Sequence, residues 1–505
     1  MTRVLSIALL LTFSCNSTQK TTTTKRDVSV LKYAETITEQ ELSDHLYTYA
    51  SDEFEGRNTG EEGEKKAIQY LKNEYEKLGI PAAQKNGDYF QKVDLEKTGV
   101  TGGSILIGNN SFNIGDGVIT YSTPIEGLTE IVYVGYGIVE GNYSDYANID
   151  VKGKFVLIKS GQPDESILPK SSKKWDNWRD TLIERMEIAT NQGAKGVLYY
   201  DSAYYNRVKS RYDHDKSLNR GSISIKTANT LVKLYISEEV ATFIYPEIES
   251  EDTPKLLNNK IELNYTKKLE EIDSKNVAAI IEGTEKPDEY VFISAHLDHI
   301  GISPNGEINN GADDDGSGTV AMLEIAEAFK KAKDAGHGPK RSIVFLHVTG
   351  EEKGLLGSEY YSNHPIFPLA NTVCDLNIDM IGRIDPKHEG DRNYIYLIGS
   401  DKLSTDLHNL SEKVNHEYCN IQLDYTYNDE NDPNQFYYRS DHYNFAKHNI
   451  PIIFYFNGTH DDYHKPTDTP DKINYDLLTN RTKLVFHTAW EVANRDQRVV
   501  VDKAE

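Results

Sequence analysis

Histidines and acidic residues follow apolar runs in the second half of the sequence. The runs have the length of buried strands, and the polar residues come where each strand would end. The five polar segments are His296-Leu-Asp298-His299, Gly311-Ala-Asp-Asp-Asp-Gly-Ser-Gly318, Thr349-Gly-Glu351-Glu352, Asn377-Ile-Asp379-Met-Ile-Gly and Tyr463-His464-Lys-Pro-Thr-Asp-Thr. Ligands of open α/β sheets bind outside the carboxyl ends of the strands, so we expect these segments to converge on one edge.

Imidazoles and carboxylates in this number favour zinc, which keeps one position open in catalytic sites. A shared carboxylate can bridge two cations roughly 3.5–4 Å apart, as in two-metal hydrolases. Three carboxylates and a bridging hydroxide then balance the charge of two zinc ions, which removes the cost of burying net charge. We expect His296 and Asp379 on one zinc, Glu352 and His464 on the other, and Asp314 bridging both.

The choice of Asp314 as the bridge leaves alternatives open. Asp313 and Asp315 flank it, and successive aspartates in a turn often stay solvated or cap the helix that follows. The remaining histidines have no place in the metal count and are expected to be structural. They include His299, His347, His442, His460 and His487.

Glu351 is left free for acid–base chemistry. Adjacent residues of an extended chain point in opposite directions, so Glu351 and Glu352 are not expected to bind the same metal ion. A carboxylate beside metal-activated hydroxide can take a proton from water and deliver it to the leaving amine. Asp298, two residues after His296, is expected to hold the other nitrogen of that imidazole.

Apolar runs alternate with helical patterns from about residue 275 onward. This alternation predicts an α/β fold with a mostly parallel sheet covered by helices on both faces. We expect strands at 290–295, 342–348, 372–381 and 450–456, and a helix at 319–331.

The first half of the chain shows two further sequence patterns. Thr38 and Glu41 form a capping box, and an amphipathic helix is expected from about 62 to 78, before Gly79. Between about 100 and 265, short alternating strands and turns predict a separate β-rich inserted domain with one polar helix near 175–192.

The charge of the chain excludes several classes of function. Its 505 residues contain 55 Lys and Arg against 79 Asp and Glu, a formal net charge of −24, which repels nucleic-acid phosphates and anionic lipid headgroups. Nucleic acid is therefore not an expected partner. After the N-terminus, no apolar run reaches the roughly 18 residues that a membrane span requires.

The N-terminus has the pattern of an export signal. Arg3 precedes the apolar run 4–11, and Cys15 stands where a bacterial lipoprotein signal places its lipidated cysteine. Thr12 occupies the position where an aliphatic residue is usual, which leaves plain secretion as the alternative. We expect a periplasmic or cell-envelope protein that touches the membrane only through this anchor. Outside the cytoplasm, Cys374 and Cys419 can either pair or stay as buried thiols.

The ordered motifs resemble those of the co-catalytic zinc aminopeptidases, whose relatives include glutamate carboxypeptidases and glutaminyl cyclases. The motifs are H-x-D, G-A-D-D, E-E, D-M-I-G and Y-H-x-P-x-D-T, spread over residues 275–495. The resemblance implies the same five zinc ligands, two zinc ions per chain, and Glu351 as the general base that helps remove N-terminal residues from peptide substrates. It also implies that Tyr463 donates its hydroxyl to the developing oxyanion.

Other readings of the resemblance stay open. The same fold supports carboxypeptidases and single-zinc glutaminyl cyclases, and receptor-like relatives have lost catalysis.

The insert looks like a protease-associated domain because of the segments 134–138, 150–154 and 193–197, and the segment 54–57 resembles the part that packs onto the catalytic domain. The expected division is a signal peptide at 1–15, a tether at 16–34, the N-terminal part of the peptidase domain at 35–100, the insert at 101–268 and the zinc peptidase domain at 269–500.

Overall fold

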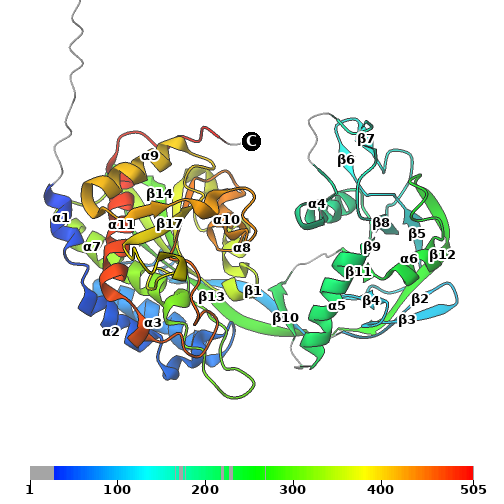
Figure 1. Cartoon of the computed structure of the whole chain (residues 1–505), viewed down its shortest axis with the longest axis horizontal. Helices are drawn as coiled ribbons and strands as arrows, with labels where there is room; N and C mark the ends of the chain where they lie inside the picture. Colours follow the sequence, from blue (N-terminus) through cyan, green and yellow to red (C-terminus); the bar gives the residue numbers. More distant parts are fainter. Residues whose placement is uncertain are drawn as a thin grey trace, which may run out of the picture.

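The structure is a computed structural model with two lobes joined by long strands (Figure 1). It describes residues 28–503 except 100, 165, 170–173, 177, 218–220, 227–230 and 268. The expected signal peptide, Cys15 and residues 16–27 of the expected tether lie outside the described residues.

The last seven residues of the expected tether form helix α1 (Val28–Ala34). Val30 and Tyr33 are buried in the core of the larger lobe, and the ring of Tyr33 stacks on Trp490 at 6.0 Å between centroids. These apolar side chains give α1 a packed face, so this stretch is part of the lobe.

Within the described residues, the sheet of the larger lobe has nine strands in the order β10-β1-β13-β15-β14-β16-β19-β17-β18. The central strands β15, β14, β16 and β19 are parallel, and so are β17 and β18 at one edge. Strands β1 and β13 pair antiparallel with their neighbours, and β17 pairs antiparallel with β19. The strands are β10 (Ser222–Ile225), β1 (Phe90–Thr98), β13 (Leu269–Ile281), β15 (Arg341–Val348), β14 (Lys286–His296), β16 (Thr372–Ile378), β19 (Ile452–Phe456), β17 (Tyr394–Ile398) and β18 (Gln422–Asp424).

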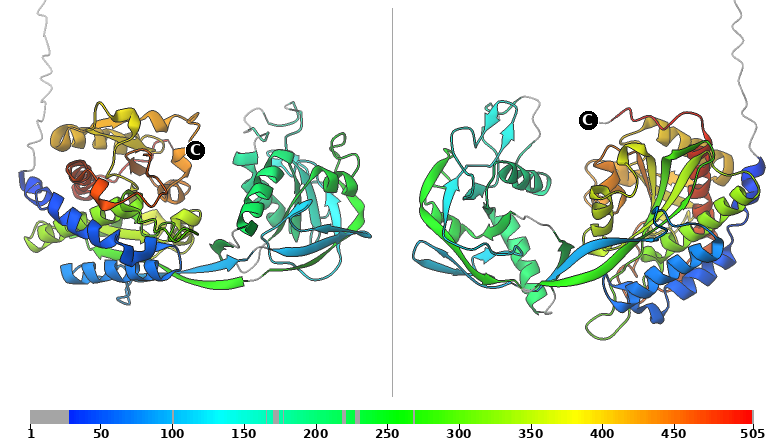
Figure 2. Two further views of the ribbon diagram at one scale, coloured as in Figure 1. Left: turned by 60° about the horizontal axis from the view of Figure 1, so that its bottom comes forward. Right: turned by 180° about the vertical axis from the view of Figure 1, so that it is seen from behind.

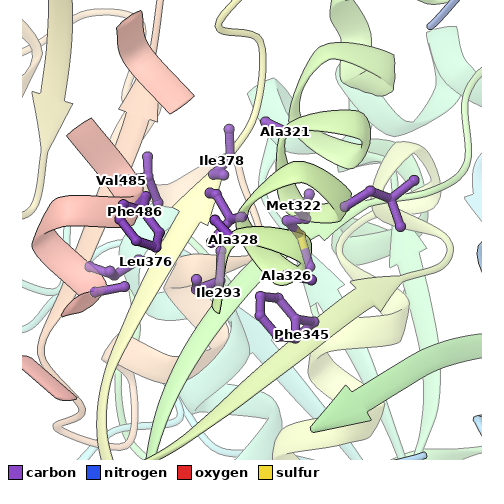
Figure 3. Packing of buried hydrophobic residues seen from close by; sticks show 14 of the residues in the cluster. Ile293, Ala321, Met322, Ala326, Ala328, Phe345, Leu376, Ile378, Val485 and Phe486 are labelled. Carbon is purple, nitrogen blue, oxygen red and sulfur yellow. The ribbon is translucent and has the colours of Figure 1, made fainter. Parts of the chain in front are cut away.

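Helices cover both faces of this sheet, which confirms the expected α/β class. Ile293 of β14 points to the face covered by α7 (Gly318–Asp334) and α11 (Tyr475–Asn494), where it meets Met322 and Phe486 (Figure 3). Phe292, the adjacent residue, points to the opposite face. Its ring lies 5.5 Å from those of Tyr361 in α8 (Leu356–Asn363) and Phe445 in α10 (His442–Ala446). Burial on both faces explains why the central strands are continuously apolar.

The remaining helices of the larger lobe are α2 (Glu39–Tyr49), α3 (Glu62–Leu78) and α9 (Thr405–Val414). The expected capping box is confirmed in one half: the Glu41 N–H donates to Thr38 Oγ1 at 3.2 Å, while Glu41 Oε2 accepts the Thr38 hydroxyl at 2.8 Å in place of the Thr38 backbone N–H. Helix α3 ends at Gly79, whose φ of 66° is a left-handed conformation that glycine adopts without strain.

In the part of the smaller lobe that the structure describes, the sheet has eight strands in the order β3-β2-β12-β5-β8-β9-β11-β4. Helix α4 (Trp178–Asn191) covers one face, and α5 (Ser202–Ser217) and α6 (Glu238–Ile244) cover the other. The insert is therefore richer in helix than its alternating pattern suggests. Its strands are β2 (Gly102–Ile107), β3 (Asn110–Asn113), β4 (Val118–Ile119), β5 (Thr129–Tyr133), β8 (Phe155–Lys159), β9 (Gly196–Tyr200), β11 (Val232–Ile236) and β12 (Lys255–Thr266), with β6 (Val139–Glu140) and β7 (Tyr143–Ser144) as a separate hairpin.

The chain first passes from the larger sheet to the smaller one between Thr98 and Gly102, and it finally returns between Thr266 and Leu269 (Figure 2). Strand β10, from the middle of the insert, pairs with β1 at the edge of the larger sheet, with Ile225 opposite Leu95. The assignment of the smaller lobe as a protease-associated domain stays a prediction.

The structure bears on the expected absence of membrane spans and on the state of the two cysteines. Among the helices that the structure describes, none combines the length and the apolar character needed to cross a membrane. Cys374 and Cys419 are both free thiols, and Cys374 is buried. Burial raises the pKa of the Cys419 thiol to about 12, which keeps it protonated at neutral pH.

Candidate metal centre

All five expected metal ligands lie at the carboxyl ends of the central strands or in the loops that follow them. His296 is the last residue of β14, Glu352 follows β15 and Asp379 follows β16. Asp314 lies in the loop before α7, and His464 lies in the loop after β19. The parallel strands therefore bring together residues that span 169 positions of the chain, counted from 296 to 464.

The first group of donor atoms consists of His296, Asp314 and Asp379. His296 Nε2 lies 3.2 Å from Asp314 Oδ1 and 3.6 Å from Asp379 Oδ1. One ligand atom from each of the three residues lies within 4.8 Å of the others, and all three side chains are buried. This set of one imidazole and two carboxylates suits a divalent metal ion.

The second group uses the other oxygen of Asp314. His464 Nε2 lies 3.0 Å from Asp314 Oδ2 and 3.2 Å from Glu352 Oε1. His299, which we expected to be structural, also lies here: its Nδ1 is 2.9 Å from Glu352 Oε1 and 3.7 Å from Asp314 Oδ2. Each oxygen of the Asp314 carboxylate thus faces a different group, which is the arrangement expected of a bridging ligand.

Several donor atoms of the two groups are buried and lack hydrogen bonds among the described residues. His296 Nε2, Asp314 Oδ2 and Glu352 Oε1 have no hydrogen-bond partner among the described residues, nor has either ring nitrogen of His299. Buried polar atoms are ordinarily paired, so a set of unpaired donors that point at one another fits cation binding. Burial and Asp314 raise the pKa of Glu352, but contacts with His299 and His464 outweigh them and lower it to about 2.

Asp313 and Asp315 are buried but point away from the two groups. Asp313 Oδ1 accepts a hydrogen bond from the Gly382 N–H at 2.7 Å, and Asp315 Oδ1 accepts one from the Met380 N–H at 3.0 Å. The alternative that Asp313 and Asp315 are solvated turn residues is therefore wrong. They attach the Asp314 loop to the segment after β16, since buried backbone N–H groups need acceptors.

Asp298 does not hold His296 in the expected way. His296 Nδ1 lies 3.0 Å from the backbone oxygen of Asp298, while the Asp298 Oδ1 atom is 3.8 Å away. The Asp298 carboxylate instead accepts hydrogen bonds from the Thr59 hydroxyl at 2.7 Å and from the Glu351 N–H at 3.1 Å. The backbone fixes the imidazole, and the carboxylate fixes the start of the Glu351 turn.

Glu351 and Glu352 lie in a 3-10 turn (Glu351–Lys353) and not in an extended chain, so the reason given for separating them is wrong. Gly350 enters this turn with a φ of 64°. The two side chains still differ in place: Glu352 contacts the second group of donors, while Glu351 lines a pocket beside Asp314 and Asp379. Burial raises the pKa of Glu351 well above its usual range, and the neighbouring Glu352 and Asp379 carboxylates add to this effect.

The pocket beside the donor groups is lined both by charged residues and by apolar and aromatic residues. Tyr463 lines it, and the Tyr463 ring stacks on His464 with centroids 3.9 Å apart. Arg439 lies at the same pocket, with its guanidinium carbon 4.8 Å from the centre of the Phe436 ring. The apolar lining residues are Met380, Phe436, Phe454 and Phe456.

The segment 54–57 packs onto the catalytic lobe through a buried arginine. The Arg57 guanidinium donates to the backbone oxygens of Asn310 at 2.7 Å and Gly311 at 2.9 Å, and its Nε donates to Leu297 O at 3.2 Å. One side chain therefore holds the loop before Asp314 and the residue after His296. The resemblance indicated that the segment 54–57 packs here, but it did not indicate these hydrogen bonds of Arg57, because a single arginine at the end of a 3-10 helix has no characteristic spacing.

Ser440 is a further residue that sequence reasoning missed. The Ser440 hydroxyl donates to Asp379 Oδ2 at 2.7 Å, which leaves Oδ1 facing His296. In the segment Ser440-Asp441-His442 the sequence predicts only a supporting role for Asp441, because contiguous residues cannot form the geometry of a nucleophilic triad. In the structure, Asp441 Oδ1 accepts a hydrogen bond from the Ser358 hydroxyl at 2.5 Å, and the His442 ring contacts the backbone oxygen of Tyr437. The three residues thus serve separate contacts.

Two histidine–carboxylate groups that share one aspartate at the edge of an α/β sheet form the donor set of a two-metal hydrolase. Comparison with known proteins finds similarity to one family in this part of the chain. Residues 276–489 match the model of Peptidase family M28.

Individual relatives extend the similarity beyond this domain. A probable leucine aminopeptidase 2 of Aspergillus oryzae is 25% identical over 347 residues, which cover 68% of this chain and 58% of that protein. Aminopeptidase YwaD of Bacillus subtilis is 27% identical over 305 residues, covering 56% and 54%. The chain thus spans a little over half the length of these relatives. The structure of an aminopeptidase from Aneurinibacillus sp. strain AM-1 shares the fold, with a TM-score of 0.51, 18% identity, and coverage of 94% of this chain and 98% of that one.

We expect Ser440→Ala to weaken metal binding without unfolding the protein. Removal of a group that orients a metal-ligating carboxylate typically costs 10–100-fold in metal affinity. Zinc affinity, measured by competition with a chromophoric chelator, should fall by about that factor. Ser400→Ala is the matched control, since Ser400 is also buried and contacts His408 Nδ1 at 3.0 Å elsewhere in the lobe. Equal zinc affinity in both variants contradicts the role of Ser440.

Proposed function

We propose that the protein is a zinc-dependent aminopeptidase that removes N-terminal residues from peptides. The observation that carries this proposal is the placement of Asp314, whose two oxygens face two separate histidine–carboxylate groups. The match of residues 276–489 to Peptidase family M28 supports peptide substrates, and the relatives named aminopeptidases support cleavage at the amino end.

The ligand set follows from the distances. His296 and Asp379 would hold one zinc ion, Glu352 and His464 the other, and Asp314 both. Bound zinc supplies a Lewis acid that polarises the substrate carbonyl and lowers the pKa of the attacking water.

We choose His464 over His299 as the imidazole of the second group. His464 Nε2 lies at similar distances from Asp314 Oδ2 and Glu352 Oε1, 3.0 and 3.2 Å, whereas His299 Nδ1 is close to Glu352 alone. His464 is also 37% exposed, while His299 is fully buried behind the carboxylates. An open metal position in a catalytic site must face the substrate, which fits the more exposed ligand.

Glu351 is the proposed proton carrier. Its side chain lines the pocket together with Asp314 and Asp379, and its backbone N–H is fixed by Asp298 at 3.1 Å. The Glu351 carboxylate would accept a proton from the attacking water and deliver it to the nitrogen of the leaving amine. Its raised pKa suits a group that must hold that proton between the two steps.

Tyr463 and the apolar residues of the pocket would position the substrate. The Tyr463 hydroxyl would donate to the oxygen of the scissile carbonyl as negative charge develops on it. The aromatic lining of Phe436, Phe454 and Phe456 would accept an apolar side chain of the N-terminal residue.

One observation favours a second candidate, a carboxypeptidase of the same fold. The guanidinium of Arg439 at the pocket can bind a carboxylate in a bidentate manner, as recognition of a C-terminal residue requires.

We also propose that the protein is exported and anchored through Cys15, on the sequence pattern of its first 15 residues.

Substrate end preference tests the proposed activity. Aminoacyl chromogens with a free amino group and an apolar side chain should be hydrolysed, and their N-acetylated counterparts should not. Peptides with an amidated C-terminus should be cut from the amino end as fast as peptides with a free C-terminus, when release of amino acids is followed by mass spectrometry. Turnover of N-blocked peptides that requires a free C-terminal carboxylate establishes the carboxypeptidase instead.

Glu351→Gln should retain zinc and lose activity. General acid–base groups contribute about 10²–10⁴-fold, so kcat should fall at least 100-fold while elemental analysis finds unchanged zinc. Glu389→Gln, at an exposed glutamate of the same lobe, is the control and should keep full activity. A Glu351→Gln enzyme with wild-type kcat removes Glu351 from this role.

Metal counting tests the ligand set. Elemental analysis of the wild-type protein should find about two zinc ions per chain, as in two-metal hydrolases. His464→Ala should retain about one, because the second group loses its imidazole, whereas His299→Gln should keep about two. Loss of a zinc ion from His299→Gln together with retention in His464→Ala shows that His299 is the ligand.

A further inference from the structure

A further cluster of potential metal ligands, separate from the two donor groups of the candidate metal centre, lies between helices α2 and α7 of the larger lobe. Glu41 comes from α2, and Glu324 and Glu327 come from α7. One carboxylate oxygen from each lies within 4.8 Å of the others. His45, one turn after Glu41, directs its Nε2 toward Glu324 Oε1 at 3.7 Å. Two neighbouring helices thus supply three carboxylates and an imidazole to one place.

Glu324 is the member of this group that most needs a partner. Its side chain is 1% exposed, and Oε2 is buried without a hydrogen-bond partner among the described residues. Burial raises the pKa of Glu324 to about 8, and the nearby carboxylates of Glu41 and Glu327 add to this effect. A buried carboxylate of this kind is costly unless it is paired or coordinates a metal ion.

The other side chains are held so that a ligand atom stays available. Glu41 Oε2 accepts the Thr38 hydroxyl at 2.8 Å, and Glu327 Oε1 contacts Lys331 Nζ at 2.9 Å, which leaves each carboxylate a second oxygen. His45 Nδ1 lies 2.6 Å from the Tyr70 hydroxyl, so its orientation is fixed through one nitrogen while the other faces Glu324. Metal-ligating histidines are commonly oriented in this way.

We propose that Glu41, His45, Glu324 and Glu327 bind a divalent cation of the first transition row, separate from the metal ions of the catalytic centre. Three carboxylates against the single charge of Lys331 leave an excess of negative charge, which a divalent cation compensates. An imidazole among the ligands favours manganese or zinc over calcium, which takes six to eight oxygen ligands.

The position of this site suggests what the cation does. It joins α2 to α7, and α7 begins directly after the loop that carries Asp314. Leu46, next to His45, packs so closely on this loop that a Cβ atom on Gly316 would lie 2.8 Å from Leu46 Cδ1. A cation between α2 and α7 therefore stabilises the lobe and the contact of α2 with the Asp314 loop.

Manganese binding tests the proposal on the full chain. The wild-type protein and each variant are equilibrated with Mn²⁺, bound manganese is counted from the EPR signal of the free ion, and Tm is measured with and without the metal. The catalytic centre contributes equally to all proteins, so the count for the proposed site is the difference between wild type and Glu324→Gln. Glu41→Gln removes a half-buried ligand, and Asp334→Asn, at an exposed carboxylate near the end of α7, is the matched control.

The wild-type protein and Asp334→Asn should each bind one equivalent of Mn²⁺ more than Glu324→Gln and Glu41→Gln. Saturating Mn²⁺ should raise their Tm by about 5 °C more than that of Glu324→Gln, because a ligand that binds the folded state alone stabilises it. Without metal, Glu324→Gln should melt at or above the wild-type temperature, since it removes a buried charge. Equal manganese counts in wild type and Glu324→Gln overturn the proposal and leave Glu324 as a protonated acid paired with His45. This result is independent of peptidase activity.

Discussion

Several carboxylates lie close together at one edge of the sheet, and the compensation of their negative charge determines the structure around the candidate metal centre. Asp298, Asp313, Asp314, Asp315 and Glu351 all lie within this edge, where unpaired negative charge is costly. Backbone N–H groups compensate three of them: Gly382 donates to Asp313, Met380 to Asp315 and Glu351 to Asp298. Asp314 alone has both oxygens directed at histidine nitrogens, and this difference in partners separates the shared ligand from its neighbours.

The N-terminal segment contributes to this edge more than its distance in sequence suggests. Glu64 of α3 is fully buried, accepts hydrogen bonds from Ser274 at 2.7 Å and from the Gly60 N–H at 2.6 Å, and is bonded to the Thr349 hydroxyl. Thr349 precedes the turn that holds Glu351. Together with the contact of Thr59 with Asp298, this means that α3 and the segment before it support the position of the proposed proton carrier.

Sequence patterns were sufficient for the strands, the main helices and the set of residues that meet at the centre. The expected strand at 342–348 corresponds to β15 (Arg341–Val348), and the expected helix at 319–331 to α7 (Gly318–Asp334). Periodicity and the position of polar residues after apolar runs carry this information, because both depend on burial alone. Counting ligands required one bridging aspartate, and only the resemblance of the ordered motifs indicated Asp314 instead of Asp313 or Asp315.

Other features depend on backbone directions that spacing does not encode. His299 follows Asp298 directly, yet its ring reaches Glu352 because the chain turns after β14 and pairs with residues 56 and 57. The Asp298 carboxylate reaches the Glu351 N–H and not His296 for the same reason. Ser440 and Arg57 act through hydrogen bonds to residues far away in the sequence, and such contacts leave no periodic trace. Helix α4 of the smaller lobe corresponds to the expected helix near 175–192, whereas α5 was not expected, because it has mainly polar residues between its few buried tyrosines and valine.

The paired strands between the lobes have a mechanical consequence. Strand β1 runs beside β13 over nine pairs, from Phe90 opposite Val277 to Thr98 opposite Leu269, and β10 adds a third strand at its edge. After a single cleavage within the smaller lobe, the N-terminal fragment keeps β1 and the C-terminal fragment keeps β13, and the hydrogen bonds between these two strands still join the fragments in the larger sheet. Such a nicked molecule should therefore run as one particle in solution.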